Sequence, residues 1–415
     1  MPVSHVLNPD VAVTGDQCDP AAPRDPQTVA TVTEGDNTRE DVRFGLLDVL
    51  ALIEDPRDAR GVRHPLVAVL AIAVVAVLAG ATNLLAIAER AADLSQEQLR
   101  RLGAWWHPGR GVFCAPSYAT LARIMHAVDA AELDRLVGGW LLGRARGLLV
   151  AGRLAGVALD GKVLRGALTA TGQLCLLQAV LHEPGVTIAQ VAVPQDTTET
   201  TQVTALLAGV DIAGMVVTAD AAHTNKATAA YLVEDNKAGY LLPVKANTPT
   251  LLAAVAARLA GPSAAWDEHC TEERGHGRIE RRTLRVATVD PEVDAIDFPH
   301  AAQVFRLRRD VLGADRIGLS KQVVFGITSL AEHQAGPAAL ADLARGQWAA
   351  EVCHWLRDVL YCEDASPITG SAAQVMATFR NIAVGMIRLT DQKAITSATR
   401  SMSHDINRAL TLIGL

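Results

Sequence analysis

The sequence predicts an α/β protein in which a helical region comes first and a mixed sheet follows. Apolar residues recur with a helical period from residue 44 to about residue 150. After a turn near Gly152 the pattern changes to β-rich runs bounded by turn residues. The 415 residues are half hydrophobic, which is enough for a sizeable core and two or three domains.

The first 43 residues differ in composition from the rest. They are polar and carry eight acidic residues against three arginines, so they hold most of the net charge of −7. They lack the basic start and apolar run of a secretory signal. We predict a flexible acidic tail at residues 1–43.

Residues 44–150 are predicted to form an all-helical N-terminal domain. Ser95 with Gln98, and Asp129 with Glu132, have the spacing of helix N-terminal caps. A loop rich in Pro and Gly at residues 107–116 separates the helices. The expected helices are residues 44–52, 66–92, 95–102, 118–127 and 130–147.

One stretch in this domain suggests two different environments. Leu66–Ala81 is a run of sixteen residues without a charged or polar side chain, as in a membrane span or a buried helix. A span requires about 18 to 20 such residues, and Thr82 and Asn83 end the run. We therefore predict a helix buried inside the N-terminal domain.

Residues 151–261 are predicted to form a mixed sheet with flanking helices. Three β-rich runs at 155–159, 173–181 and 187–193 indicate an antiparallel meander. The elements expected after it are helix 203–207, strand 212–218, helix 225–234, strand 239–245 and helix 250–259. This βββαβαβα order is that of the RNase H-like fold, in which the first and fourth strands are neighbours.

A β-rich insertion is predicted at residues 262–330, with strands at 282–288, 302–307 and 322–327. Helices resume at 338–343, 347–361 and 372–388. The RNase H-like catalytic domain would therefore comprise residues 151–261 and 331–390. Residues 391–415 are polar and lack periodicity, and we predict a C-terminal tail.

Three carboxylates occupy informative positions in this order of elements. Asp160 and Asp220 each follow an apolar, strand-like run, and Glu351 lies in an amphipathic helical stretch. Ligands of α/β sheets gather at strand ends, and carboxylates are hard oxygen ligands. Three converging carboxylates can hold two Mg²⁺ ions for in-line phosphoryl transfer. An aspartate after a strand is also an ordinary cap or turn residue, so each acid alone is a weak signal.

Six segments, taken in order, resemble the DDE transposases of bacterial insertion sequences. The resemblance is to the ISAs-type branch, which includes the H-repeat-associated proteins of Rhs elements. It covers most of the chain between about residues 44 and 390. The segments are Asp55–Ala81, Ala158–Gly166 (ALDGKVLRG), Val216–Leu251, Glu273–Arg282 (ERGHGRIERR), Ile327–Leu330 and Arg345–Asp364.

The resemblance implies a metal-dependent enzyme that cuts the ends of its own mobile element and joins the freed 3′-hydroxyls to target DNA. Asp160 would bridge two Mg²⁺ or Mn²⁺ ions, while Asp220 and Glu351 would each bind one. The partner would be double-stranded DNA, bound by a homodimer, with no membrane involved. Six cysteines without metal or disulfide spacing agree with a cytoplasmic bacterial protein that acts at the nucleoid.

Several polar residues are candidates for DNA contact. The net charge argues against indiscriminate binding, but residues 274–285 carry five arginines and one acid. The glycines at 275 and 277 would let backbone approach a phosphate. The alternatives are surface ion pairs and a solvated hairpin tip. The candidates are Lys162, Arg165, Lys245, Asn247, Arg274, His276, Arg278, Arg281 and Arg282, and residues 44–150 are the candidate domain for reading DNA ends.

The chain departs from the family pattern at several positions, including Val352, the spacing of His354 from Glu351, and Ala246 with Thr248. Val352 follows Glu351 where relatives typically have Asn, and Glu363 is the alternative third ligand. Residues 194–199 keep only Glu199 from a Lys-x-Asn-Glu segment. Two other functions stay open: an inactive or domesticated DNA-binding remnant, and a metal-dependent nuclease without strand transfer.

Overall fold

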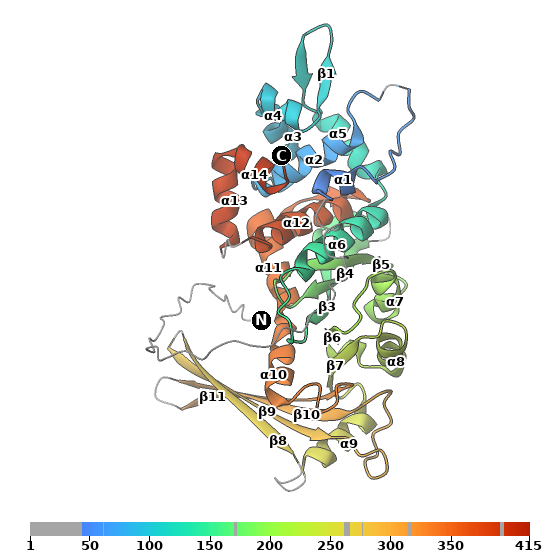
Figure 1. The fold of residues 1–415 in the computed structure, drawn as a ribbon, viewed down its shortest axis with the longest axis vertical. Helices are drawn as coiled ribbons and strands as arrows, with labels where there is room; N and C mark the ends of the chain where they lie inside the picture. Colours follow the sequence, from blue (N-terminus) through green and yellow to red (C-terminus); the bar gives the residue numbers. More distant parts are fainter. Residues whose placement is uncertain are drawn as a thin grey trace, which may run out of the picture. The chain divides into compact units, whose positions relative to one another are not determined.

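The computed structural model of the protein describes residues 44–415, apart from residues 61, 170–171, 261–265, 276, 314–316 and 391–393. The acidic tail predicted at residues 1–43 lies outside the described residues. Within them, helices combine with one large mixed sheet, which confirms the predicted α/β class (Figure 1).

The first half of the large sheet carries the predicted strand order. Its strands lie side by side in the order β5 (Thr187–Val193), β4 (Gly172–Leu181), β3 (Gly156–Thr169), β6 (Val216–Thr218) and β7 (Gly239–Val244). β3, β4 and β5 form the predicted antiparallel meander, while β6 and β7 run parallel to β3. The first and fourth strands of this half are therefore neighbours, as predicted.

The β-rich insertion continues the same sheet. β11 (Gly318–Thr328) pairs antiparallel with β7, and the order then runs through β10 (Gln303–Gly313) and β9 (Arg278–Thr288) to β8 (Asp267–Gly275). The three predicted strands are present but longer than expected. β8 was not expected, because this mostly exposed strand has no alternation of apolar residues.

Residues 44–150 contain the predicted helices and one feature that corrects the all-helical expectation. Strands β1 (Trp105–His107) and β2 (Val112–Cys114) form a hairpin in place of the predicted loop. Trp106 and Phe113 pair across it, with ring centroids 4.9 Å apart. The helices are α1 (Leu46–Leu50), α2 (Leu66–Leu78), α3 (Leu84–Ala92), α4 (Gln96–Arg101), α5 (Tyr118–Ala127) and α6 (Ala130–Arg146).

The predicted capping signals function as expected, and one predicted helix is divided. The Ser95 hydroxyl accepts from the Gln98 backbone N–H, and Asp129 accepts from the backbone of Glu132. The expected helix 66–92 breaks between α2 and α3, where Gly80 has a φ of +91° and Asn83 caps α3.

The apolar helix α2 is buried, as predicted. Almost every one of its 13 residues is inaccessible to solvent. It packs against α3 and against α12 (Ala372–Arg388), which also contacts α6 (Figure 1). None of the described helices has both the length and the apolar character that a bilayer crossing requires.

The predicted C-terminal tail is wrong for the described residues. α13 (Ile395–His404) and α14 (Ile406–Leu412) pack against α2. Ile395, Ala398 and Met402 have the i, i+3, i+7 spacing of an apolar helix face and are buried. This pattern covers only two turns, and the Ser, Thr and Arg residues between its members obscure it in the sequence.

Helices cover the sheet around β3. Val157 and Leu159 share a core with Leu206 of α7 (Val203–Leu207) and Leu232 of α8 (Lys226–Glu234). The side chain of Ala158 points to the opposite face of the sheet and packs with Ala350 of α11 (Trp348–Tyr361). The remaining helices are α9 (Pro249–Leu259) and α10 (Pro337–Gly346), which directly precedes α11.

Candidate functional site

The alternation of β3 directs Asp160 toward α11. Side chains two apart on a strand point to the same face, so Asp160 shares the face of Ala158, which packs with Ala350 and Cys353 of α11. Asp160 therefore lies within a long strand and not at the end of one, which corrects the sequence expectation. β3 continues past Asp160 because its hydrogen-bonded pairing with β4 extends to Leu164 before the register shifts.

The parallel register of β3 and β6 brings the two aspartates together. Ala158 pairs with Thr218, and each is followed two residues later by an aspartate, Asp160 on one strand and Asp220 beyond the other. Asp220 ends the strand as predicted and caps the short 3₁₀ turn that follows, accepting from the Ala222 backbone N–H at 2.9 Å. Its side chain is 59% exposed.

Glu351 approaches Asp160 from the first turn of α11. Burial and the charges of Glu351, Glu199 and Asp220 raise the pKa of Asp160 to about 6. Partial burial of the carboxyl also raises the pKa of Glu351. The structure thus brings the three predicted acids close enough for their charges to interact.

Gln347 holds the elements that carry the three acids. This residue immediately precedes α11, and its side-chain amide donates to the Leu159 carbonyl at 3.0 Å. Its carbonyl oxygen accepts from the Thr218 hydroxyl at 2.5 Å. One side chain therefore joins β3 next to Asp160, β6 just before Asp220, and the start of the helix that bears Glu351. Nothing in the sequence pattern singled out Gln347.

A fourth carboxylate, that of Glu199, lies close enough to Asp160 to raise the pKa of Asp160. A methyl group on Gly161 would overlap the Glu199 carboxylate, so only glycine permits this approach beside Asp160. The buried His223 imidazole lies 3.9 Å from Glu199 and equally 3.9 Å from Asp220, and it lowers the pKa of Glu199. The sequence signal for Glu199 was that it is the residue retained from the Lys-x-Asn-Glu segment of relatives, whose other positions differ here.

The donor set fits a divalent cation. Among the described residues, no three His, Cys, Asp or Glu side chains already enclose a metal-sized space. The converging groups are nevertheless carboxylates, the ligands that Mg²⁺ and Mn²⁺ prefer. Burial and then the repulsion among these carboxylates raise the pKa of Asp160, and a bound cation would offset both effects.

Glu363, the alternative third ligand, has a different environment. Its side chain is fully buried and pairs with Arg357 at 2.6 Å and Arg380 at 3.0 Å. Burial alone would raise the pKa of Glu363, but these two guanidinium groups and Lys162 lower it to about 2. Its charge is already neutralised, in contrast to the charge on Asp160 and Glu351.

Lys162 is a correction to the predicted DNA contacts. It points toward α11 like Asp160, and its side chain is only 7% exposed. Its ammonium lies 2.6 Å from Asp358 and 3.6 Å from Asp364. The lysine is therefore held by internal carboxylates and not presented to phosphate. Arg165, on the same strand, is 80% exposed and remains accessible.

Asp220 and Glu351 line a groove of about 370 Å³ between the insertion and α10–α11. Four cationic side chains line it, namely Lys245 and three arginines, Arg282, Arg309 and Arg345, each of which is paired with Glu273 or Glu280. Two of these, Lys245 and Arg282, are among the predicted DNA contacts. Asn247, also predicted, donates its amide to the Ala221 carbonyl at 2.7 Å, so it fixes the turn that follows Asp220.

The basic hairpin tip is less cationic than the sequence count indicated. Arg281 pairs with Glu272 of the facing strand β8 at 2.9 Å, and Arg274 lies 3.5 Å from the same acid. Arg282 lies 3.3 Å from Glu273. The count along residues 274–285 omitted these acids because β8 was not expected. Arg278 begins β9, and His276 lies outside the described residues.

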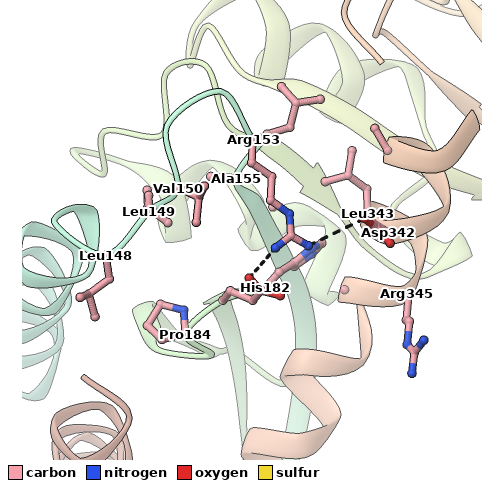
Figure 2. A pocket seen from close by; sticks show the side chains of 15 residues that line it. Leu148, Leu149, Val150, Arg153, Ala155, His182, Pro184, Asp342, Leu343 and Arg345 are labelled. Atoms are coloured by element: carbon pink, nitrogen blue, oxygen red, sulfur yellow. Dashed lines mark hydrogen bonds and ion pairs between the residues drawn. The ribbon is translucent and has the colours of Figure 1, made fainter. Parts of the chain in front are cut away.

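A larger cavity of about 1000 Å³ lies elsewhere and contains none of the three acids (Figure 2). Arg153 crosses it and pairs with Glu183 at 2.8 Å and Asp342 at 3.8 Å. His182 also lines it, and the His182 ring hydrogen-bonds the Thr218 hydroxyl at 2.9 Å. Burial and Arg153 lower the pKa of His182 to about 4, so the ring is neutral at pH 7.

Comparison with known proteins gives consistent matches. The chain is similar to two proteins of Escherichia coli. The "Putative transposase YncI" of O157:H7 is 27% identical, over 83% of this chain and 87% of that protein. The "H repeat-associated putative transposase YhhI" of strain K12 is 26% identical, over 86% of this chain and 93% of that protein. The match to a structure of a piggyBac transposase synaptic complex with hairpin DNA covers 89% of this chain and 77% of that chain, at 9% identity and a TM-score of 0.42.

The family matches account for both halves of the described chain. Residues 47–141 match the family described as "DDE_Tnp_1-associated". Residues 154–386, more than half of the chain, match the family described as "Transposase DDE domain" and include Asp160, Asp220 and Glu351. The protein therefore belongs to the DDE transposase family.

Proposed function

We propose that this protein cuts the ends of a mobile DNA element and joins them to target DNA. The observation that carries the proposal is the register of β3 and β6, which sets Asp160 beside Asp220 beneath the first turn of α11. We further propose that β3 to β7 together with α11 form an RNase H-like catalytic core. The strand order β5-β4-β3-β6-β7 supports this assignment.

Asp160, Asp220 and Glu351 would hold one or two Mg²⁺ or Mn²⁺ ions, with Asp160 as the shared ligand. Such ions, when bound, activate the attacking oxygen and stabilise the departing one. Gln347 keeps the three carboxylates in fixed relative positions through its bonds to β3 and β6. Asn247 does the same for the turn after Asp220.

The groove cations would bind the DNA that reaches these acids. Lys245 and Arg282 line the groove with Asp220 and Glu351, so phosphates held there would lie next to the carboxylates. Arg165, Arg274, Arg278 and Arg281 would extend the contact outside it. We propose that residues 44–150 read the element ends, and that two copies act together on DNA.

The test is a gel assay with a labelled fragment that ends in the element terminus, incubated with target plasmid and Mg²⁺. Wild type is expected to cut the terminus and produce joined products. Asp160→Asn, Asp220→Asn and Glu351→Gln are each expected to abolish both steps while DNA binding persists. Cutting without joining would indicate a nuclease, and binding without either step would indicate an inactive remnant.

A further inference from the structure

His354 on α11 lies between Asp160 and a chain of buried amides. Its Nδ1 is 3.4 Å from the Asp160 Oδ2, and its Nε2 is 3.0 Å from the Gln178 Oε1. Gln178 is directly opposite Asp160 in the β3–β4 register. The side chain is 13% exposed, so the ring has little freedom to rotate away from these two neighbours.

The orientation of Gln190, which follows in the chain of amides, is fixed by its charged neighbours. Its Nε2 lies 3.1 Å and 3.2 Å from the two carboxylate oxygens of Asp134, which only accept. Its Oε1 faces Nη1 of Arg357, which only donates, at 3.5 Å. Both contacts require the same orientation of the Gln190 amide, with its oxygen toward Gln178.

This orientation determines the proton position on His354. Gln178 meets the Gln190 oxygen with its Nε2, so its own oxygen points to the histidine. The His354 Nε2 must therefore carry the hydrogen and donate it to Gln178. In the neutral ring the other nitrogen, Nδ1, then has a free lone pair, and that lone pair faces the Asp160 carboxylate.

Two acceptors thus face each other across 3.4 Å, an arrangement that a cation stabilises. We propose that His354 is a nitrogen ligand of the divalent cation held by Asp160, and that Gln178, Gln190 and Asp134 are positioning residues that fix its tautomer. The inference rests on the proposed metal-dependent function. It agrees with the usual arrangement in which a ligating imidazole donates its second N–H to a protein oxygen.

The chain of hydrogen bonds connects α6 of the helical region to α11 through two strands of the sheet. Asp134 lies on α6, Gln190 on β5, Gln178 on β4 and His354 on α11. Gln374 of α12 donates to Asp134 at 2.8 Å, so the acid is held from that helix as well. The helical region therefore contributes to the orientation of a residue beside Asp160.

The test uses full-length protein loaded with Mn²⁺ and pulsed electron paramagnetic resonance, which detects a directly bound nitrogen. Wild type is expected to show ¹⁴N coupling that changes when the histidines are labelled with ¹⁵N. His354→Gln is expected to bind Mn²⁺ but lose the coupling. A wild-type spectrum without histidine coupling, or a coupling unchanged in His354→Gln, would overturn the inference without touching the three acids.

The positioning role of Gln178 is tested separately, by measuring the dissociation constant for Mn²⁺ by calorimetry. Gln178→Leu is expected to raise it by about 10- to 100-fold, the usual effect of losing a partner of a metal-bound histidine. Gln173→Leu, on the same strand but exposed, is the matched control and should leave it unchanged. Equal dissociation constants for Gln178→Leu and wild type would remove the positioning role. Failure of wild type to bind Mn²⁺ at all would reject the metal-dependent function itself.

Discussion

At the scale of single residues, two glutamates close in sequence have opposite environments. Glu351 is flanked by other carboxylates and contributes to the raised pKa of Asp160. Glu363 is enclosed by Arg357 and Arg380 and its pKa is lowered to about 2. The sequence showed both as acids near the end of the catalytic domain. It could not distinguish them, because the arginines that neutralise Glu363 come from the preceding helix α11 and from α12.

Glu363→Gln is therefore expected to affect stability and not metal binding. It leaves two guanidinium groups buried without their partner, which typically costs about 3 to 5 kcal/mol. Denaturant unfolding at pH 7 measures this loss, and Mn²⁺ affinity should stay at the wild-type value. A folded Glu363→Gln protein that no longer binds Mn²⁺ would make Glu363 the third ligand.

The same residue predicts a pH dependence. The pKa of Glu363 is about 2 in the folded protein against an ordinary value of 4.5, so its stabilisation is complete above pH 4.5 and is lost as the pH falls toward 2. The shift corresponds to about 3 kcal/mol. The difference in unfolding free energy between wild type and Glu363→Gln should shrink as the pH is lowered through this range. A constant difference would contradict the ion-pair explanation.

Glu199 gives a further prediction at this scale. Its carboxylate adds negative charge beside Asp160, so Glu199→Gln is expected to weaken Mn²⁺ binding by up to about 10-fold, equivalent to about 1.4 kcal/mol. Calorimetric titration measures the change. Glu183→Gln, an exposed acid paired with Arg153 at the other cavity, is the control. Equal affinities for Glu199→Gln and wild type would place Glu199 outside the metal environment.

At the scale of elements, the attachment of α11 is the decisive feature of the site. The sequence predicted this helix, its Glu351 and the strands beneath it from their periodicity and order. It could not predict Gln347, because a single polar side chain at a helix start has no periodic signal. It also missed β8, an edge strand whose mostly exposed polar residues lack the alternation by which strands are identified.

Gln347→Leu is expected to lower the rate of DNA cutting by about 100-fold or more, because displacing a catalytic group by about 1 Å has an effect of that size. The change removes the bonds to Leu159 and Thr218 but keeps the helix and its acid. Initial cutting rates at saturating metal measure it. Gln334→Leu, in the turn before α10, is the control. An unchanged rate would show that packing alone positions α11.

At the scale of the whole molecule, the β-rich insertion closes one side of the groove that contains Asp220 and Glu351. The sequence predicted an insertion at this place, but not that its strands would continue the sheet that carries Asp160, because long-range strand pairing leaves no local pattern. The same limitation explains why the hairpin of β8 and β9 is less cationic than the sequence predicted, because the acidic partners of its arginines lie on the facing strand. It also explains why Lys162 was wrongly predicted to contact DNA, because its acidic partners are about 200 residues away in the sequence.

DNA binding tests this arrangement of charges. Lys245→Ala is expected to reduce the slope of log affinity against log salt concentration by about one, as for the loss of one phosphate contact. Fluorescence anisotropy over a range of salt concentrations gives the slope. Lys237→Ala, an exposed lysine whose ammonium bonds a backbone carbonyl, is the control. Equal slopes for Lys245→Ala and wild type would exclude the groove as the DNA path.

The pairing of β11 with β7 affects the solubility of any shortened form of this protein that lacks the insertion. Without residues 262–330, β7 would become the border of the sheet, with its backbone donors and acceptors open to any other strand. Such borders promote aggregation unless they are short, charged or covered, and β7 is mostly apolar (GYLLPV). The insertion is therefore a protective cover as well as one wall of the groove. A shortened chain lacking it should precipitate even though Asp160, Asp220 and Glu351 all remain.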